Sequence, residues 1–265
     1  MADESSTPAA PAAPAAPAAP ATPAAPATPA ASSTPRQRYR DQVRGEIKAA
    51  ALEQIRVGGA PALSVNAVAK GLGLTGPALY KYFRNRDDLL TELICDGYDA
   101  AAVAMREAAD RAADAPPRER LLALGTALRA WAIAAPHVYQ LLAGTPSPGY
   151  QAPPETTDRA RAVLGPLLGV LGQGDCAGAA LELRAEMRFW LNETPAVEEW
   201  VRAWAPDVDP ATALAGTVTA WARLHGIVSL EVQGLFGGMG HSPGTLLKAE
   251  MEALADAMGL PGAAR

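Results

Sequence analysis

The chain has 265 residues, 49% of them hydrophobic, so it is long enough to bury one sizeable core or two smaller ones. It has no run of about 18 uncharged apolar residues and no secretory signal pattern, so we expect a globular cytoplasmic protein without a membrane segment. Two cysteines, Cys95 and Cys176, are too few for a disulfide framework, and we interpret both as buried small hydrophobic residues.

The formal net charge of -5 is distributed unevenly along the chain. Residues 36–90 carry ten Lys or Arg against five acids, whereas residues 91–265 carry 13 basic against 21 acidic groups. The first segment is therefore +5 and the second -8. A basic segment beside an acidic one is typical of a head that binds a polyanion, although small basic domains also occur without such a partner.

Residues 1–35 consist almost entirely of Ala, Pro, Ser and Thr. This composition cannot bury enough apolar surface to offset the entropy of ordering, so we expect a disordered tail with polyproline II character. From Arg36 onward the apolar residues recur at helical spacing, and alternating β-branched runs are missing. The predicted fold class is all-α.

Helical spacing predicts the first helices over residues 39–57, 64–70 and 75–83. Ser64 and Thr75 can cap the second and third of these helices, and two glycines between them permit a tight turn. Prolines mark the joins between the later helices. These are predicted near residues 87–113, 118–135, 136–143, 157–172, 177–204 with a break near Pro195, 211–235 and 243–258, with a loop over 145–154.

Two short helices joined by a tight turn are what a helix-turn-helix requires, because its second helix must project into a major groove. The stretch from residue 47 to residue 90 closely resembles the N-terminal domain of TetR-family repressors. The matching features are an Ala-Ala pair followed by Gly59, residues 64–69 (SVNAVA), Gly73 at the turn, residues 78–83 (ALYKYF) and residues 88–90 (DLL).

In that family the second and third helices contact double-stranded operator DNA. The resemblance implies DNA contacts at Ser64, Asn66, Thr75, Pro77, Tyr80, Lys81, Tyr82 and Arg86. Chemistry supports these assignments: Lys81 and Arg86 can neutralise phosphates, and hydroxyl groups beside helix N-termini can bond phosphate oxygens. Asn66 or Tyr80 can reach base edges.

Two features weaken the prediction that the helix over residues 75–83 recognises bases. Tyr80 can instead be a core residue, because its neighbours at helical spacing are apolar. Gly76 and Ala78 stand where relatives often carry longer side chains. Base recognition would then depend more on Pro77, Tyr80 and Lys81.

Other motifs do not indicate a cofactor or an enzyme. Residues 71–76 satisfy G-x-G-x-x-G, but a helix rather than a strand precedes them, which excludes a dinucleotide site. His137, His225 and His241 show no i, i+4 pairing with a carboxylate nearby, so we expect no metal site. No nucleophile with a partnering base can be nominated.

The second half places aromatic residues among Ala and Leu, a mixture that can leave a ligand cavity, although ordinary core packing is the alternative. Residues 137–139 (HVY), 144–150 (GTPSPGY), 221–226 (WARLHG) and 228–231 (VSLE) resemble the WHG-type C-terminal domain of TetR relatives, which hold a small-molecule inducer there. The candidate ligand-binding residues are Tyr98, Trp131, Tyr139, Phe189 and Trp190.

The same resemblance implies a homodimer in which the helix over residues 221–236 and the final helix pair with their copies. Its candidate interface residues are Trp221, Leu224, His225, Val228, Phe236, Leu247, Met251 and Leu254. Among them, His225 is expected as a hydrogen-bonded core or interface residue rather than a ligand or catalytic base.

These patterns predict a tail over residues 1–35, a helix-turn-helix DNA-binding domain over 36–90, and a helical ligand-binding and dimerisation domain over 91–265. The expected function is a repressor that a small hydrophobic inducer releases from its operator. Two alternatives stay open: a helical enzyme or ligand carrier that retains a degenerate helix-turn-helix, and a helical interaction protein without a pocket.

Overall fold

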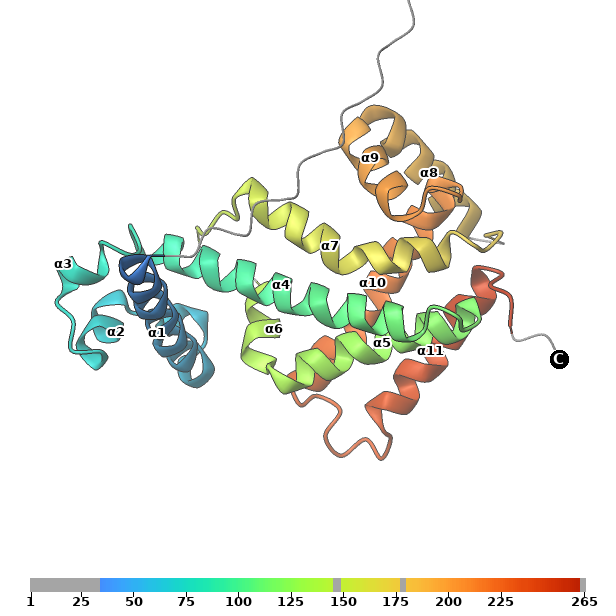
Figure 1. Cartoon of the computed structure of the whole chain (residues 1–265). Coiled ribbons are helices and arrows are strands. Elements are labelled where there is room, and N and C mark those ends of the chain that lie inside the picture. Colours follow the sequence, from blue (N-terminus) through green and yellow to red (C-terminus); the bar gives the residue numbers. More distant parts are fainter. Residues whose placement is uncertain (1–33, 145–148, 177–179, 263–265) are drawn as a thin grey trace, which may run out of the picture. The chain divides into compact units, whose positions relative to one another are not determined.

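The structure is a computed structural model that describes residues 34–144, 149–176 and 180–262. The chain divides after Arg40 into two compact units, residues 1–40 and 41–265. All regular elements of the described residues are helices, eleven of them α-helical (Figure 1). The all-α prediction is confirmed. Most of the predicted tail, residues 1–33, lies outside the described residues.

The first elements are α1 (Pro35–Gly58), a 3-10 helix (Ala60–Ala62), α2 (Val65–Gly71) and α3 (Gly76–Leu79). Helix α1 begins four residues earlier than expected, because a proline at a helix start sacrifices no intrahelical hydrogen bond. Helix α3 ends at Leu79 instead of Phe83. The chain tightens there into turns, in which the N–H of Tyr82 bonds the carbonyl of Leu79 at 2.8 Å.

The remaining helices agree with the predicted ranges to within a few residues. Six of these eight begin with a proline, whose fixed φ suits the first helical position. Residues 145–148 of the predicted loop, and the expected helix start at 177–179, lie outside the described residues. The eight helices are α4 (Arg86–Arg111), α5 (Pro117–Ala134), α6 (Pro136–Ala143), α7 (Pro154–Leu171), α8 (Ala180–Glu193), α9 (Pro195–Trp204), α10 (Pro210–Val232) and α11 (Pro243–Ala257).

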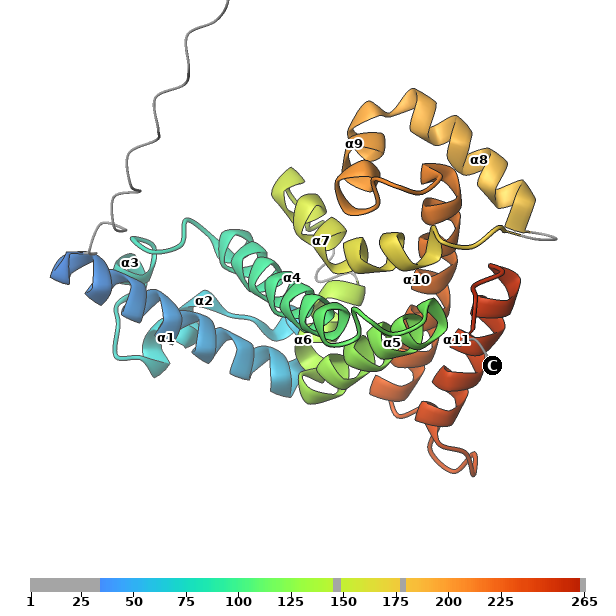
Figure 2. The same cartoon turned by 45° about the vertical axis from the view of Figure 1, so that its right-hand side comes forward.

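Helix α4 contributes to two separate hydrophobic cores. Its first turns, with Leu90 and Leu93, pack into a cluster with α1, α2 and α3 that includes Ile47. Its second half, with Met105, packs with α5, α7, α10 and α11 around Leu124. Figure 2 shows α4 running from the neighbourhood of α1 to that of α5. Below, "head" means residues 41–90, and "body" means the described part of residues 91–262.

Helices α8 and α9 form a hairpin on one side of the body, packed on α7 and α10 (Figure 1). Val197 and Val201 of this hairpin are buried against Leu168 and Leu214. The ring of Trp204 lies so close to α7 that a Cβ at Gly165 would sit 2.3 Å from it. Glycine at this position is therefore required for α9 to approach α7.

Several expectations from composition can be compared with the structure. Cys176 is buried as expected, whereas Cys95 on α4 is only half-buried. Among the described residues, no group of three or more His, Cys, Asp or Glu is placed to hold a metal ion. No single described helix is long and apolar enough to cross a membrane, and only α5 and α6 taken together reach that length, bent by 110° at their junction.

Candidate nucleic-acid interface

Side-chain caps fix the start of both short helices of the head. The Ser64 hydroxyl accepts a hydrogen bond from the N–H of Ala67 at 3.3 Å, and the Thr75 hydroxyl accepts one from the N–H of Ala78 at 3.3 Å. Gly73 adopts φ +66° in the turn between them, which a glycine adopts without strain. Because each cap uses the hydroxyl as an acceptor, its hydrogen remains available to donate to a phosphate oxygen.

The residues around α3 separate into a buried and an exposed set. Leu79 and Phe83 fill the core, with 0% and 1% of their surface exposed, while Tyr80 is 48% exposed. The core interpretation of Tyr80 is therefore wrong. Lys81 is exposed beside it. The turn that follows α3 presents an aromatic ring and an ammonium group to solvent, and these groups can reach both base edges and phosphates.

The other side chains expected to contact DNA take different positions. Asn66 and Pro77 are exposed, and the Asn66 amide oxygen lies 3.5 Å from where a Cβ of Gly76 would stand. A Cβ at Gly76 would therefore make an ordinary van der Waals contact with that amide. Tyr82 is half-buried, and its backbone carbonyl accepts a hydrogen bond from Arg44 at 2.6 Å.

Arg86 is engaged inside the head. Its Nε donates to the carbonyl of Leu63 at 3.0 Å, and a terminal nitrogen donates to the carbonyl of Ala60 at 2.7 Å. The other terminal nitrogen lies 3.5 Å from the Asp87 carboxylate. The guanidinium ties the start of α4 to the segment that precedes α2, and the expected phosphate contact of Arg86 stays a prediction. These hydrogen bonds could not be predicted from the sequence, because only the fold brings the two carbonyls close to Arg86.

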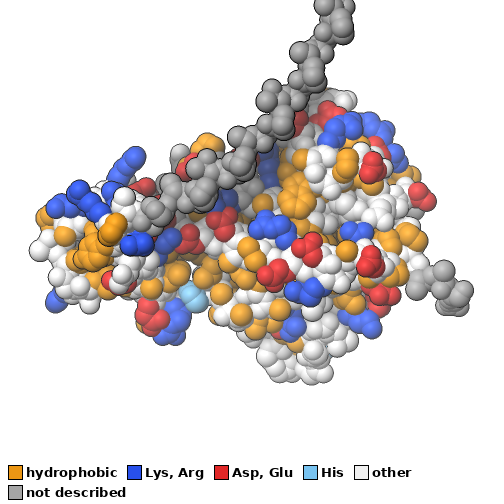
Figure 3. Space-filling view, in the orientation of Figure 1, with side chains coloured by type: hydrophobic (Ala, Val, Ile, Leu, Met, Phe, Trp, Pro, Cys, Tyr) orange, Lys and Arg blue, Asp and Glu red, His pale blue; other side chains and the backbone are white. Residues whose placement is uncertain are grey.

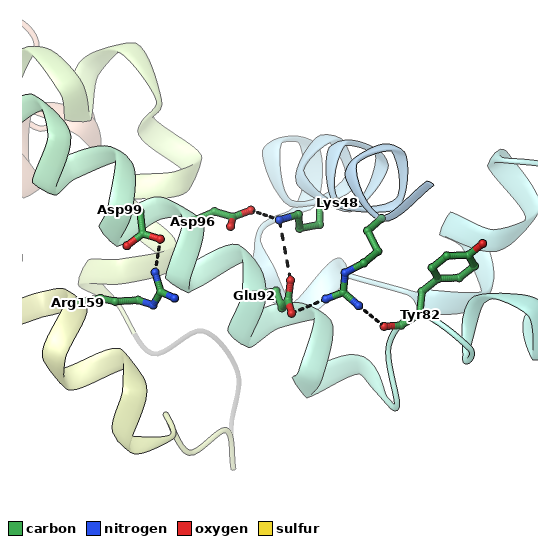
Figure 4. Close-up of polar contacts among 7 residues, drawn as sticks. Lys48, Tyr82, Glu92, Asp96, Asp99 and Arg159 are labelled. Atoms are coloured by element: carbon green, nitrogen blue, oxygen red, sulfur yellow. Dashed lines mark hydrogen bonds and ion pairs between the residues drawn. The ribbon is translucent and has the colours of Figure 1, made fainter. Parts of the chain in front are cut away.

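Basic side chains of α1 join the head to α4 (Figure 4). Arg44 forms an ion pair with Glu92, and its guanidinium lies 4.4 Å from the centre of the Phe83 ring. Lys48 lies 2.6 Å from the Asp96 carboxylate and 3.9 Å from that of Glu92. These charges are used within the protein, so the electrostatic attraction for DNA depends more on exposed residues such as Lys81.

A reciprocal cap begins α4. The Asn85 side chain accepts from the N–H of Asp88 at 2.7 Å, and the Asp88 carboxylate accepts from the N–H of Arg84 at 2.8 Å. Such a pair satisfies two backbone donors at once and fixes the angle at which the chain enters the helix. The acidic residue of the sequence DLL is therefore explained by its capping role.

The surface of the body carries both signs of charge. Across the middle of the face drawn in Figure 3, acidic and basic side chains lie interspersed. One ion pair of the body joins Arg159 of α7 to Asp99 of α4, and it is drawn in Figure 4. Mixed charge of this kind gives no extended positive field to attract a polyanion.

The predicted ligand residues fall into two places. Tyr98, Trp131 and Tyr139 line one small cavity of about 30 Å³, and the rings of Trp131 and Tyr139 meet edge to face with centres 6.3 Å apart. Phe189 and Trp190 lie elsewhere on α8, with 68% and 42% of their surface exposed. Phe189 therefore does not contribute to the small cavity, because α8 turns its ring to solvent.

A polar group lies beside the small cavity. The Tyr139 hydroxyl is 3.0 Å from Nδ1 of His225, whose ring stacks on Trp221 with centres 5.6 Å apart. Burial raises the pKa of Tyr139 to about 12, so its phenol stays protonated at neutral pH. His225 is thus a hydrogen-bonded residue of the body, as its place on an apolar helix predicts.

Most of the predicted dimer residues are buried within one chain. The five most buried ones leave 2% or less of their surface exposed, because the apolar faces of α10 and α11 pack on α5 and on each other: Leu224, Val228, Leu247, Met251 and Leu254. Their side chains have no surface to offer a second chain, which corrects that expectation. Trp221, His225 and Phe236 are half-buried.

Two capped helices around a glycine turn, with Tyr80 and Lys81 exposed directly after the second, define a helix-turn-helix DNA-binding protein. Comparison with known families is specific. Residues 47–93 match the family described as "Bacterial regulatory proteins, tetR family", and residues 121–254 match the "Tetracyclin repressor-like, C-terminal domain".

Known relatives agree with this assignment. HTH-type transcriptional regulators Rv1816 of Mycobacterium tuberculosis and Mb1846 of Mycobacterium bovis are each 30% identical over 217 residues, which is 81% of this chain and 92% of theirs. The crystal structure of SCO4313, described as a regulatory protein, is 43% identical with a TM-score of 0.70, over 84% of this chain and 100% of that one. A protein of unknown function from Rhodococcus sp. RHA1 shares the fold, with 21% identity, a TM-score of 0.59, and coverage of 82% and 95%.

The chain therefore belongs to the TetR family of transcriptional regulators. This is a family of DNA-binding regulators and not of enzymes. Its members bind operator DNA.

Proposed function

We propose that this protein is a cytoplasmic repressor whose head binds an operator and whose body binds a small hydrophobic inducer that releases it. The observation that carries the proposal is the exposed pair Tyr80 and Lys81 at the end of a capped helix-turn-helix. Within this proposal the DNA-binding domain spans residues 36–90 and the ligand-binding and dimerisation domain spans residues 91–265.

Different exposed residues of the head contact phosphates and bases, according to the chemistry of their side chains. Lys81 neutralises a backbone phosphate, and the capping hydroxyls of Ser64 and Thr75 donate to phosphate oxygens beside helix N-termini. Tyr80 and Asn66 contact base edges in the major groove. The remaining expected contacts change accordingly: Pro77 packs on the groove, while Tyr82 and Arg86 hold the helices in place.

We further propose that two copies of the chain act together. A homodimer presents two heads to the half-sites of a palindrome, about one helical turn or more apart. An inducer that binds the body better in one spacing of the heads shifts the population toward that spacing. Because most expected interface side chains on α10 and α11 are buried, the contact between copies must use the exposed faces of these helices or of their neighbours.

Fluorescence anisotropy with the DNA upstream of the protein's own gene tests the proposal. The wild-type protein should bind this DNA more tightly than a scrambled duplex, and its affinity should fall steeply between about 50 and 200 mM salt. Lys81→Ala should reduce the slope of log affinity against log salt by about 1. Tyr80→Ala should lower the preference for the operator about tenfold.

Arg111→Ala is the matched control, because Arg111 is an exposed basic residue at the end of α4 beside Glu107. Its removal should leave both the affinity and the salt dependence unchanged. Equal binding to upstream and scrambled DNA would speak for a remote operator or against the proposal, and binding across a genomic DNA library would separate the two. No selected sequence in that library would reject the proposal.

A further inference from the structure

A second cavity lies in the body, between α7 and the helices α8, α9 and α10. It has a volume of about 260 Å³, compared with about 30 Å³ for the cavity around Tyr139. Three of its lining residues are the tryptophans Trp190, Trp200 and Trp221. Aromatic walls of this kind accept flat apolar groups, which stack on or lie edge-on to the rings.

In the described part of the chain, two buried polar atoms without a protein partner belong to residues that line this cavity. Among the described residues, three buried side-chain nitrogen or oxygen atoms have no hydrogen-bond partner: Nε1 of Trp200, Oγ1 of Thr217 and Nε of Arg120. The first two belong to residues that line the cavity. Thr217 is 1% exposed, so bulk solvent does not reach it. Buried polar groups normally have a partner, so two without a protein partner beside one cavity mark a place where a bound group can supply it.

Thr219 shows that a backbone carbonyl of α10 can accept a hydrogen bond from a threonine hydroxyl. Thr219, two residues further along α10 than Thr217, donates to the carbonyl of Ala215 at 2.9 Å. Thr217 has the equivalent backbone carbonyl four residues before it, but no such bond forms. Its hydroxyl therefore keeps its hydrogen-bonding capacity unused within the described part of the protein.

A positive charge stands at the same cavity. Arg161 of α7 lines it, and its guanidinium lies 5.9 Å from the centre of the Trp200 ring. One of its nitrogens is 3.2 Å from the carboxylate of Asp158, which is 79% exposed. An ion pair with so exposed an acid is weak, so the guanidinium can bind a second carboxylate at small cost.

We propose that this cavity is the effector site of the protein and that it takes a small aromatic monocarboxylate. The indole N–H of Trp200 can only donate, so the ligand must present an acceptor there. Thr217 adds a second donor, and Arg161 makes a carboxylate the favoured acceptor. The tryptophan rings hold the apolar part. This inference rests on the proposed function, because it names the ligand class and the place of the inducer.

Trp221 connects this site to the rest of the body. It lines both cavities, and its ring stacks on His225, which bonds Tyr139. The small cavity is also lined by Tyr98 of α4, the helix that packs into the head core. A ligand that moves Trp221 therefore acts on packing that reaches α4, and it can favour one position of the heads over another.

Isothermal titration calorimetry with 2-naphthoate and indole-3-acetate tests the site, with 2-naphthamide as the uncharged control. Both acids should bind the wild-type protein, and the amide should bind at least about tenfold more weakly. Thr217→Val and Arg161→Met should each weaken 2-naphthoate about tenfold or more. Thr219→Val should leave its affinity unchanged, because that hydroxyl is bonded to Ala215.

Thermal unfolding of the ligand-free variants separates binding from folding. Thr217→Val removes an unpartnered buried hydroxyl and should not lower the Tm, so a loss of binding cannot be attributed to unfolding. Failure of both acids to bind the wild-type protein at millimolar concentration would overturn the inference. Equal affinity in wild type, Thr217→Val and Arg161→Met would overturn it as well.

Anisotropy on operator DNA in the same samples keeps this inference apart from the proposed function. If the ligand-free protein binds its operator and neither acid binds the protein, the effector site is wrong and the regulator proposal stands. If the ligand-free protein binds no specific DNA, the regulator proposal fails whatever the acids do. Release of operator DNA by 2-naphthoate, lost in Thr217→Val, is the result that we expect.

Discussion

The head and the body use their polar groups in opposite ways. In the head, Ser64 and Thr75 cap helices, and the guanidinium of Arg86 is bound to backbone carbonyls. In the body, two polar atoms at one cavity, on Trp200 and Thr217, have no partner among the described residues. The head is thus held in one geometry, which suits a region that fits a DNA groove, while the body, where we propose that a ligand binds, keeps space and unpartnered donors.

The largest expected effect concerns the head core. Leu79 is completely buried below the DNA-reading surface, so Leu79→Ala should lower the free energy of unfolding by about 2–5 kcal/mol and abolish operator binding. Urea unfolding followed by circular dichroism, at one fixed protein concentration, measures this. Val103→Ala, at a position 45% exposed on α4, should change the free energy by less than about 0.5 kcal/mol. Equal losses in the two variants would contradict the assignment of the core.

The next effect belongs to the body and depends on pH. Because the pKa of Tyr139 is raised to about 12, its phenol stays protonated in the folded protein while that of the unfolded chain ionises above its usual pKa of 10. Its stabilising contribution is therefore complete below pH 10 and is lost as the pH rises to about 12, a decrease of roughly 2–3 kcal/mol. In urea unfolding at several pH values, Tyr139→Phe should show a shallower decline than wild type. Parallel curves would refute the raised pKa.

Arg86 and Lys81 sharpen the comparison within the head. Arg86→Met leaves two backbone carbonyls without their donor and should lower the free energy of unfolding by about 1–3 kcal/mol. The variant should bind the operator more weakly with an unchanged salt dependence, in contrast to Lys81→Ala. Anisotropy over a salt series distinguishes the two variants. A reduced slope of log affinity against log salt in Arg86→Met would mean that Arg86 contacts a phosphate after all.

The smallest effect is that of the ion pair between α1 and α4. Lys48 and Asp96 are 2.6 Å apart, but half of the Asp96 side chain is exposed, so the pair is screened by water. A double-mutant cycle with Lys48→Met and Asp96→Asn should give a coupling free energy of only about 0.2–1 kcal/mol. A coupling several times larger would mean that charge pairing, rather than the buried apolar cluster, joins the head to α4.

Much of the fold could be predicted from local signals. Ser64, Thr75 and the prolines act within one helical turn of themselves, so their positions fix helix starts without knowledge of the rest of the chain. The apolar residues of α1 that recur every three or four positions, such as Ile47 and Ala51, likewise predict its buried face from local sequence. The end of α3 could not be predicted, because Tyr80 and Lys81 are compatible with a helix, whereas the chain forms turns there and Phe83 packs in the head core.

The site was predictable only in part. Exposure of Tyr80 depends on which neighbours fill the core, and the task of Arg86 depends on carbonyls more than twenty residues away. An apolar stripe does not say whether it packs within one chain or between two, which is why Leu224 and Met251 were expected at a dimer interface. The polar residues of the larger cavity, Arg161 and Thr217, have no motif of their own.

The most direct test of a two-headed helix-turn-helix regulator is hydroxyl-radical footprinting of the full-length protein on the upstream DNA. The account predicts two equal protected segments related by two-fold symmetry, with centres about one helical turn or more apart, both lost in Lys81→Ala at moderate salt. A single protected segment, or uniform protection along the duplex, would contradict the account, because it would mean one head or sequence-independent binding.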